Sequence, residues 1–254
     1  MGKWKKWLSA GLFTALLGTA IIAGPTADVS ANAGNKPYNI ENVSPDAHLA
    51  PSVGDSSSKT SSKAWHKIDG VCYNGSGKKV EGAITRGMDV SEWQGKINWK
   101  EAKKDLDFAF VRISYGTRHL DDYYDYNMTE AEAADVPVGT YVYSLAKTNK
   151  EALAEAQLAI RQMQGHKVSY PVAFDLEDEA TLGTLTRKEI SQIALTFCDE
   201  IRKAGYTPIL YMNLNWYNNF VDWNVLEGSG LDVWIASYGD TILAPSASKY
   251  KYTI

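Results

Sequence analysis

The chain has 254 residues, of which 44% are hydrophobic and 22% are charged, a composition that suits one large or two small globular domains. The formal net charge is −4, and the part that follows residue 33 carries −6, so nucleic acid is not an expected partner. Eight Trp and fifteen Tyr suit either a packed core or a surface that stacks on sugar rings, and composition does not separate these uses.

Residues 1–33 have the pattern of an export signal. The opening MGKWKKW is basic, residues 8–23 are apolar and small, and the run Ala31-Asn32-Ala33 offers a small-x-small cleavage site. Because the apolar segment is shorter than the ~20 residues that span a bilayer, we favour a cleaved signal over an uncleaved anchor. The expected mature protein has no stable membrane span and is secreted, extracellular or located in the cell wall.

Two segments of weaker character follow. Residues 34–64 end in the Ser/Lys/Gly run GDSSSKTSSKA, which predicts a disordered linker. Residues 65–83 alternate apolar and polar positions around Asn74-Gly75, which indicates a short hairpin; we favour a spacer over a small wall-binding or docking element. Cys72 in this segment is far in sequence from Cys198, and we favour two separate thiols over a disulfide.

The remaining residues, 84–254, alternate strand-like and helix-like segments. The expected strands lie at residues 84–90, 108–115, 138–145, 170–176, 207–212 and 232–236. The expected helices lie at residues 98–105, 128–135, 150–164 and 187–204. Nearly continuous apolar strands are typical of a parallel sheet covered by helices, and repeated units of this length predict an α/β fold, either a barrel or a doubly wound sheet.

The residues that end the expected strands favour the barrel. Several of these ends carry a polar or aromatic residue: Asp89, Tyr115, Tyr143, Asp175 with Glu177, Asn213, and Ser237 with Tyr238. Polar groups at the carboxyl ends of strands mark the active face of a β/α barrel. A nucleotide-binding sheet would more often show a glycine-rich first turn, and the sequence has none.

Three of these residues are carboxylates that we expect in one cleft. Asp175 and Glu177 are two apart on a strand, so their side chains leave the same face of the sheet. Asp89 would point into the same mouth. Repulsion and partial desolvation would raise the proton affinity of at least one of them. One protonated and one ionised carboxyl group is the arrangement that glycoside hydrolysis requires.

Other interpretations of these acids stay open. Asp175 and Glu177 could be salt-bridged or bind a metal, and Asp89 could cap a turn. A metal site would want further ligands, and the four histidines have no ligand spacing, so no metal or cofactor is expected and each histidine is expected at the surface. The nucleophile-elbow, Walker A and dinucleotide-binding motifs are also absent from the sequence.

Seven motifs, taken in order, resemble those of the family 25 glycoside hydrolases, the bacterial and phage lysozymes. They are RGMDVSEWQGKINW, DFAFVRISYGT, DDYYDYN, PVGTYVYS, PVAFDLED, PILYMN and VWIASYG. The resemblance runs from about residue 84 to the end of the chain. It implies an irregular TIM-like β/α barrel that cleaves the β-1,4 bond between N-acetylmuramic acid and N-acetylglucosamine in peptidoglycan.

The resemblance also implies a role for each acid. Glu177 corresponds to the proton donor, Asp175 to the residue that positions or stabilises the substrate's acetamido group, and Asp89 to a residue that sets the electrostatics. Sequence leaves retaining and inverting routes open, because they differ in carboxyl separation, ~5 Å against ~6.5 to 9.5 Å. Family members continue with a Trp-Gln strand and a late acidic residue, whereas this sequence stops at KYKYTI, so we expect a barrel that lacks its last strand or strands and has unpaired strand edges.

Six aromatic residues at or near strand ends are candidate sugar-binding groups. They are Tyr143, Tyr238, Tyr115, Tyr211, Trp93 and Trp234. Packing is an equal alternative for each, and Tyr143 and Tyr238 are the stronger candidates. Trp99, at a helix start, is expected in the core.

The expected protein is thus a monomeric, secreted peptidoglycan hydrolase that acts on glycan strands. A chitinase-like N-acetylhexosaminidase is the enzyme alternative, because the same D-x-E pattern would serve it. A non-catalytic wall-binding protein is the alternative from another class.

Overall fold

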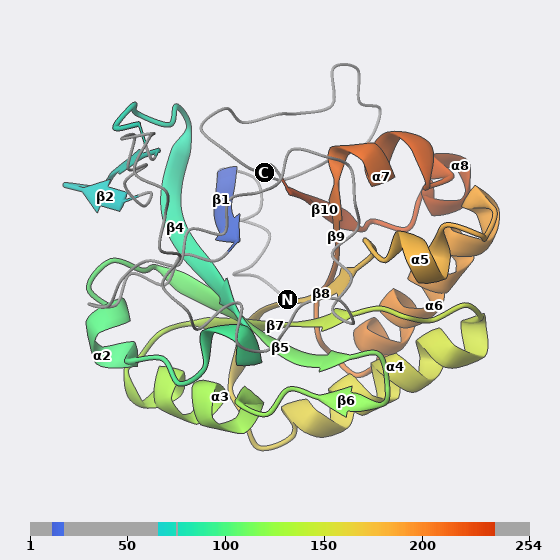
Figure 1. Cartoon of the computed structure of the whole chain (residues 1–254), viewed down its shortest axis with the longest axis horizontal. Helices are drawn as coiled ribbons and strands as arrows, with labels where there is room; N and C mark the ends of the chain where they lie inside the picture. Colours follow the sequence, from blue (N-terminus) through green and yellow to red (C-terminus); the bar gives the residue numbers. More distant parts are fainter. Residues whose placement is uncertain (1–11, 18–65, 75, 237–254) are drawn as a thin grey trace, which may run out of the picture.

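The computed structural model describes residues 12–17, 66–74 and 76–236 (Figure 1). Its main sheet runs in the order β1 (Leu12–Leu17), β4 (Ala83–Val90), β5 (Phe108–Tyr115), β7 (Val138–Tyr143), β8 (Val168–Asp175), β9 (Pro208–Asn213) and β10 (Asp232–Ala236). Each of these neighbours is parallel. A short strand, β6 (His119–Leu120), pairs antiparallel with the end of β5. From β4 onward the neighbouring strands of this sheet follow one another in chain order. The sheet is curled and forms a parallel half-barrel.

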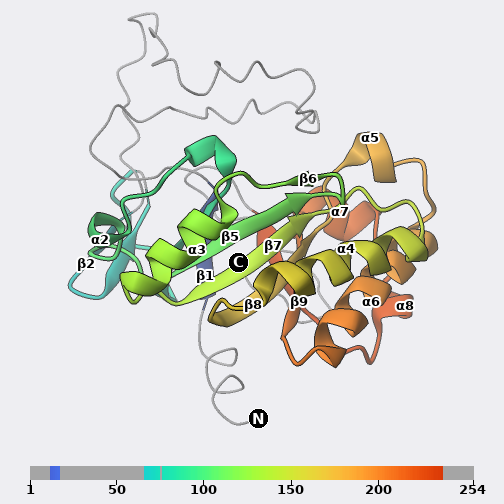
Figure 2. The ribbon, with the colours of Figure 1, turned by 90° about the horizontal axis from the view of Figure 1, so that it is seen from below.

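Helices connect the strands and cover the outer face of the sheet (Figures 1 and 2). They are α2 (Trp99–Ala102), α3 (Tyr124–Ala133), α4 (Asn149–Met163), α5 (Glu179–Leu182), α6 (Arg187–Lys203), α7 (Leu214–Asn219) and α8 (Trp223–Leu226), with a 3₁₀ turn, η3 (Glu92–Gln94), after β4. Local sequence sets where the longest one begins. Thr186 and Glu189 form a capping box at the start of α6, where each side chain bonds the other's backbone N–H.

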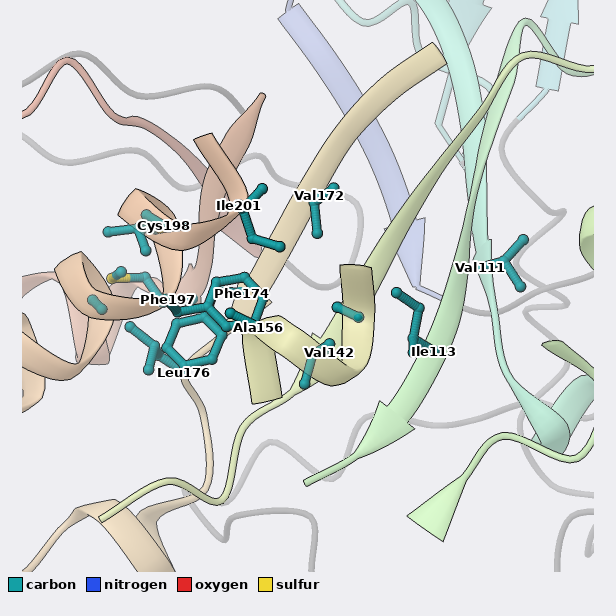
Figure 3. Packing of buried hydrophobic residues seen from close by; sticks show 14 of the residues in the cluster. Val111, Ile113, Val142, Ala156, Val172, Phe174, Leu176, Phe197, Cys198 and Ile201 are labelled. Carbon is teal, nitrogen blue, oxygen red and sulfur yellow. The ribbon is translucent and has the colours of Figure 1, made fainter. Parts of the chain in front are cut away.

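Alternation along the strands separates two hydrophobic layers. On the outer face, Val111, Val142 and Phe174 pack against the helices (Figure 3). Phe174 stacks on Phe197 of α6 with ring centroids 4.0 Å apart. On the inner face a second cluster contains Phe108, Phe110, Ala173, Ile209, Tyr211, Trp234 and Ala236. Successive side chains point to opposite sides of a strand, so one apolar run supplies both layers.

Two glycines leave room for the inner aromatic rings. A Cβ at Gly87 would lie 2.2 Å from the ring of Phe108, its register partner on β5. A Cβ at Gly139 would lie 2.6 Å from both the Phe110 ring and the Pro171 carbonyl oxygen. The absence of a side chain at these positions is therefore what lets β4, β5 and β7 curl around the two phenylalanines.

The six strands and four helices expected from the sequence are all present, with ends that differ by a few residues. The largest difference is the second expected helix, which begins at Tyr124 instead of residue 128. Strand β1 lies within residues 1–33, the expected export signal, and the structure describes the chain with these residues present. Cleavage of the signal therefore stays a prediction. In the described part of the chain, no helix has the length and apolar character needed to cross a membrane.

The expected hairpin exists, but its turn lies elsewhere. β2 (His66–Ile68) and β3 (Val71–Tyr73) are joined at Asp69-Gly70, both with positive φ, rather than around Asn74. The hairpin also packs on the sheet, where Cys72 of β3 clusters with Ala83 of β4, and its role as a spacer stays a prediction. Lys67 Nζ lies 2.6 Å from Asp107 Oδ2, which in turn accepts the backbone N–H of Arg86. A wall-binding role for this hairpin stays a prediction.

The two cysteines lie apart, as the favoured interpretation held. Cys72 and Cys198 are both buried free thiols. Cys72, on strand β3 of the hairpin, packs with Val80 and Ala83, whereas Cys198 on α6 belongs to the outer layer.

Candidate active site

The carboxyl ends of β4 and β8 bring the three predicted acids to one end of the half-barrel. Met88 and Val90 face the outer layer, so Asp89 between them faces inward. The same alternation turns Asp175 inward beside Ala173, while Phe174 faces out. Asp89 and Asp175 are each 6% exposed, and Glu177, two residues further, is partly exposed.

Burial raises the proton affinity of all three acids, and repulsion adds to it at Asp89 and Asp175. The pKa of Asp89 rises from 3.8 to about 7, chiefly because it is buried and also because Glu177 carries like charge. Burial also raises the pKa of Glu177 to about 7. The pKa of Asp175 lies well above its usual range through burial, then through Glu177 and Asp89. Near neutral pH the cluster therefore holds protons that isolated carboxyl groups would have lost.

One oxygen of each acid is buried without a hydrogen bond to any described residue. These atoms are Asp89 Oδ2, Asp175 Oδ1 and Glu177 Oε1. Buried polar atoms normally have a partner, and such a trio at the end of a barrel-like sheet indicates where a polar ligand would bind.

Asn213 orients the other side of Glu177. Its side chain and its backbone N–H both bond Glu177, which favours the ionised form and partly offsets the effect of burial. Its Oδ1 accepts the backbone N–H of Trp216 at 3.0 Å and so caps α7. The bond to Trp216 therefore fixes the orientation of the Asn213 side chain, which in turn orients the carboxyl group of Glu177.

A buried arginine that sequence reasoning missed lies beside the acids. Arg112 is 3% exposed on β5, where Tyr141 is its register partner, and its positive charge lowers the pKa of Asp175. Arg112 Nε donates to Asp121 Oδ2 at 2.9 Å, and Arg112 Nη2 lies 2.9 Å from Glu92 Oε1. The available signal was alternation, because Arg112 is two residues beyond Phe110 and four beyond Phe108 on the inner face.

Glu92 and Asp121 also link this arginine to the loop that follows Asp89. The backbone N–H of Glu92 donates to Asp121 Oδ2 at 2.8 Å, and Glu92 Oε2 lies 2.7 Å from His119 Nε2. These ion pairs and hydrogen bonds therefore connect η3, β5 and β6 around the buried guanidinium of Arg112. They hold the loop after Asp89 in a defined position.

Two predicted aromatic residues form a pair near the acids. Tyr115 and Tyr143 stack with ring centroids 5.0 Å apart and an interplanar angle of 22°. Tyr143 is the register partner of Asp175, and burial together with the charge of Asp175 raises the Tyr143 pKa. Tyr115 Oη donates to Asp178 Oδ2 at 3.4 Å. Both rings are partly exposed, so the pair is a candidate platform for a sugar.

The other predicted aromatic residues divide differently. Tyr211 and Trp234 are 4% and 6% exposed and pack edge to face at 4.6 Å in the inner cluster, which favours the packing alternative; a sugar-binding role for them stays a prediction. Trp93 is partly exposed in η3, and Tyr238 lies outside the described residues. Trp99 is buried, as expected, and its Nε1 donates to Asn127 Oδ1.

Most of the chain is similar to a known protein family. The model of glycosyl hydrolases family 25 matches residues 88–253. Lysozyme M1 of Streptomyces globisporus is 26% identical over 164 residues, which are 61% of this chain and 55% of that protein. The chain spans about half the length of the curated relatives it matches.

Two solved structures with the same fold are informative. A family 25 glycosyl hydrolase from Bacillus anthracis aligns with a TM-score of 0.54 at 24% identity, covering 65% of this chain and 75% of that one. The modular autolysin LytC from Streptococcus pneumoniae, in complex with a synthetic peptidoglycan ligand, aligns with a TM-score of 0.56 at 19% identity, covering 74% and 52%. At these identities the likeness establishes the fold.

Proposed function

Because the chain belongs to glycosyl hydrolase family 25, we propose that it is a peptidoglycan muramidase that cleaves the β-1,4 bond between N-acetylmuramic acid and N-acetylglucosamine. The observation that carries the proposal is the convergence of Asp89, Asp175 and Glu177 at the carboxyl ends of β4 and β8, with raised pKa values. Lysozyme M1 and the LytC complex with a peptidoglycan ligand support this substrate class.

In the proposed reaction Glu177 is the general acid. With its pKa raised to about 7 it keeps its proton in mildly acidic solution, and it gives that proton to the glycosidic oxygen as the bond from that oxygen to C1 breaks. The bonds from Asn213 then stabilise the carboxylate that Glu177 becomes. The leaving sugar departs as an alcohol, and positive charge develops on the ring that keeps C1.

Asp175 and Asp89 face that developing charge. We assign to Asp175 the positioning or stabilisation of the substrate's acetamido group, whose oxygen would attack C1 in a retaining route. The positive charge of Arg112 offsets part of the burial and repulsion that raise the pKa of Asp175. In its ionised form Asp89, at the end of β4, contributes negative potential. Fixed charges in a site of low polarity stabilise a transition state more strongly than they would in water.

We further propose that the Tyr115–Tyr143 pair stacks on a sugar ring next to the scissile bond. The pair adjoins Asp175 through the register of β7 and β8. The N-terminal pattern of basic, apolar and small residues supports export, so the proposed place of action is outside the cell or in its wall, on glycan strands and as a monomer.

Glu177→Gln tests the proposal. The variant should lose about 10²- to 10⁴-fold of the activity that releases reducing ends from purified peptidoglycan, because glutamine has no proton to give. Glu179→Gln, on an exposed residue two positions further, is the matched control and should keep wild-type activity. Circular dichroism and thermal melting should show both variants folded.

The same assay separates the alternatives. Retained activity in Glu177→Gln would remove Glu177 from the reaction. Cleavage of chitin oligomers but not peptidoglycan by the wild type would favour the chitinase-like enzyme. Binding to insoluble peptidoglycan without release of reducing ends would favour a wall-binding protein.

A further inference from the structure

Another buried carboxyl group lies outside the site, on helix α4. Glu155 is on α4 and only 2% exposed. Three alanines of the same helix, Ala152, Ala156 and Ala159, are fully buried. The helix therefore packs closely on the sheet, and Glu155 is buried together with this face. Burying a carboxyl group is costly unless hydrogen bonds satisfy it, so its partners indicate its purpose.

Both oxygens of Glu155 accept hydrogen bonds from the turn that follows β7. Glu155 Oε2 accepts from Ser144 Oγ at 2.8 Å, and Glu155 Oε1 accepts from the backbone N–H of Leu145 at 3.0 Å. Ser144 Oγ in turn accepts the backbone N–H of Ala146 at 3.2 Å. The Glu155 side chain therefore accepts hydrogen bonds from two donors in the turn directly after Tyr143.

The same turn is bonded to the ends of both neighbouring strands. The backbone N–H of Ser144 donates to the carbonyl oxygen of Asp175 at 3.0 Å. On the other side, the N–H of Gly116 donates to the carbonyl oxygen of Tyr143 at 2.8 Å. Gly116 has a positive φ, and a Cβ there would lie 3.1 Å from Leu145 Cδ1, so the leucine packs directly against it.

We propose that Glu155 is a positioning residue that holds the ends of β5, β7 and β8 in register, and with them the Tyr115–Tyr143 pair and Asp175. This inference rests on the proposed muramidase function. Glu155 touches none of the three acids' side chains in the described contacts; it acts through Ser144 and Leu145. A shift of these strand ends would misplace the reacting sugar while leaving more distant binding contacts intact, so the expected loss is in kcat more than in KM.

Glu155→Gln is the informative variant because it keeps the shape of the side chain. Its amide oxygen can still accept the Leu145 N–H, but its NH₂ group meets Ser144 Oγ, whose own proton then has no acceptor there. The bonds also lose the contribution of the negative charge. Glu151→Gln is the matched control, because Glu151 on the same helix also accepts two bonds from a loop, at Lys147 and Thr148, but is exposed.

Two measurements on the full chain decide the matter. For Glu155→Gln we expect kcat on soluble glycan strands to fall about tenfold to hundredfold with KM changed less than threefold, and amide hydrogen exchange at residues 115–116 and 144–146 to quicken at least tenfold. Glu151→Gln should change neither. Ser144→Ala should give part of the same loss, and the double variant should lose less than the two single losses combined.

The outcomes keep this inference separate from the function it rests on. Unchanged exchange in Glu155→Gln would overturn the positioning role, whether or not the protein is an enzyme. Faster exchange with unchanged kcat in an active wild type would overturn it as well. A wild type that cleaves no glycan, together with faster exchange in the variant, would reject the muramidase proposal while supporting the hold of Glu155 on the strand ends.

Discussion

The two faces of the central sheet are made from the same strands but bury different chemistry. The outer face carries Val111, Val142 and Phe174 against helices and is mainly apolar. The inner face is aromatic through its middle, at Phe110 and its neighbours, and becomes charged at the carboxyl end of the strands, where Asp89 and Asp175 lie. The outer face buries mainly apolar side chains, which stabilise the fold. The inner face also buries carboxyl groups at one end, and burying them costs free energy of folding.

Phe174→Ala should show the largest effect on the apolar face. The ring is fully buried and stacks on Phe197, so its removal should lower the free energy of unfolding by about 3–5 kcal/mol, measured by urea denaturation. Phe220→Ala, which removes a partly buried ring stacked on Trp216, should cost clearly less. At a temperature where the Phe174→Ala variant is folded, its kcat should match the wild type. A large loss of kcat there would mean that the two faces are not independent.

Asp89→Asn should show the opposite behaviour. Loss of the negative charge should lower kcat about 10²- to 10³-fold, because fixed charges near the reacting sugar contribute on that scale. The free energy of unfolding near pH 7 should stay the same or increase, since the variant no longer buries a group that repels Glu177. The measurements are glycan hydrolysis and urea denaturation. A strongly destabilised Asp89→Asn would show that this carboxyl group is structural.

The pH dependence of stability should reveal the charged end of the inner face. Burial raises the pKa values of Asp89 and Glu177 from 3.8 and 4.5 to about 7, so between pH ~4 and ~7 the folded protein binds more protons than the unfolded chain. The free energy of unfolding should therefore fall as pH rises through this window.

The Asp89→Asn variant is also the control for this smaller effect. It removes one of the contributing groups, and one fully titrating group accounts for at most about 1.4 kcal/mol per pH unit. The fall in stability with pH should accordingly be shallower in the variant. Equal slopes in the two proteins, measured by urea denaturation at several pH values, would argue that Asp89 ionises normally in the folded state.

Much of the fold followed from short-range patterns. The strands at Phe108–Tyr115 and Asp232–Ala236 have the expected ends, because uninterrupted apolar runs bounded by polar residues are strong local signals. The hairpin turn was misplaced because Asn74-Gly75 resembles a tight turn more closely than Asp69-Gly70 does; Asn74 Oδ1 instead accepts the N–H groups of Ser76 and Lys78 in a second turn.

The candidate site was predictable only in part. Asp175 and Glu177 were predicted from their spacing of two residues, which places side chains on the same face of a strand, although β8 itself ends at Asp175. Tyr115 and Arg112 are three apart, and simple alternation would place them on opposite faces. A register irregularity between Arg112 and Ser114 lets Tyr115 pair with Tyr143 and stack on it, and no local pattern announces that irregularity.

By itself the sequence determined the order of strands and helices, the pair of acids at the end of β8 and the family to which the chain belongs. Tertiary structure alone decided that Arg112 lies between Glu92 and Asp121, that Asn213 bonds Glu177, and that Tyr211 and Trp234 pack inside. The reason is physical. Periodicity records which face a side chain takes, but a hydrogen bond or an ion pair between distant residues depends on strand register and curvature, which emerge only when the sheet closes around its inner cluster.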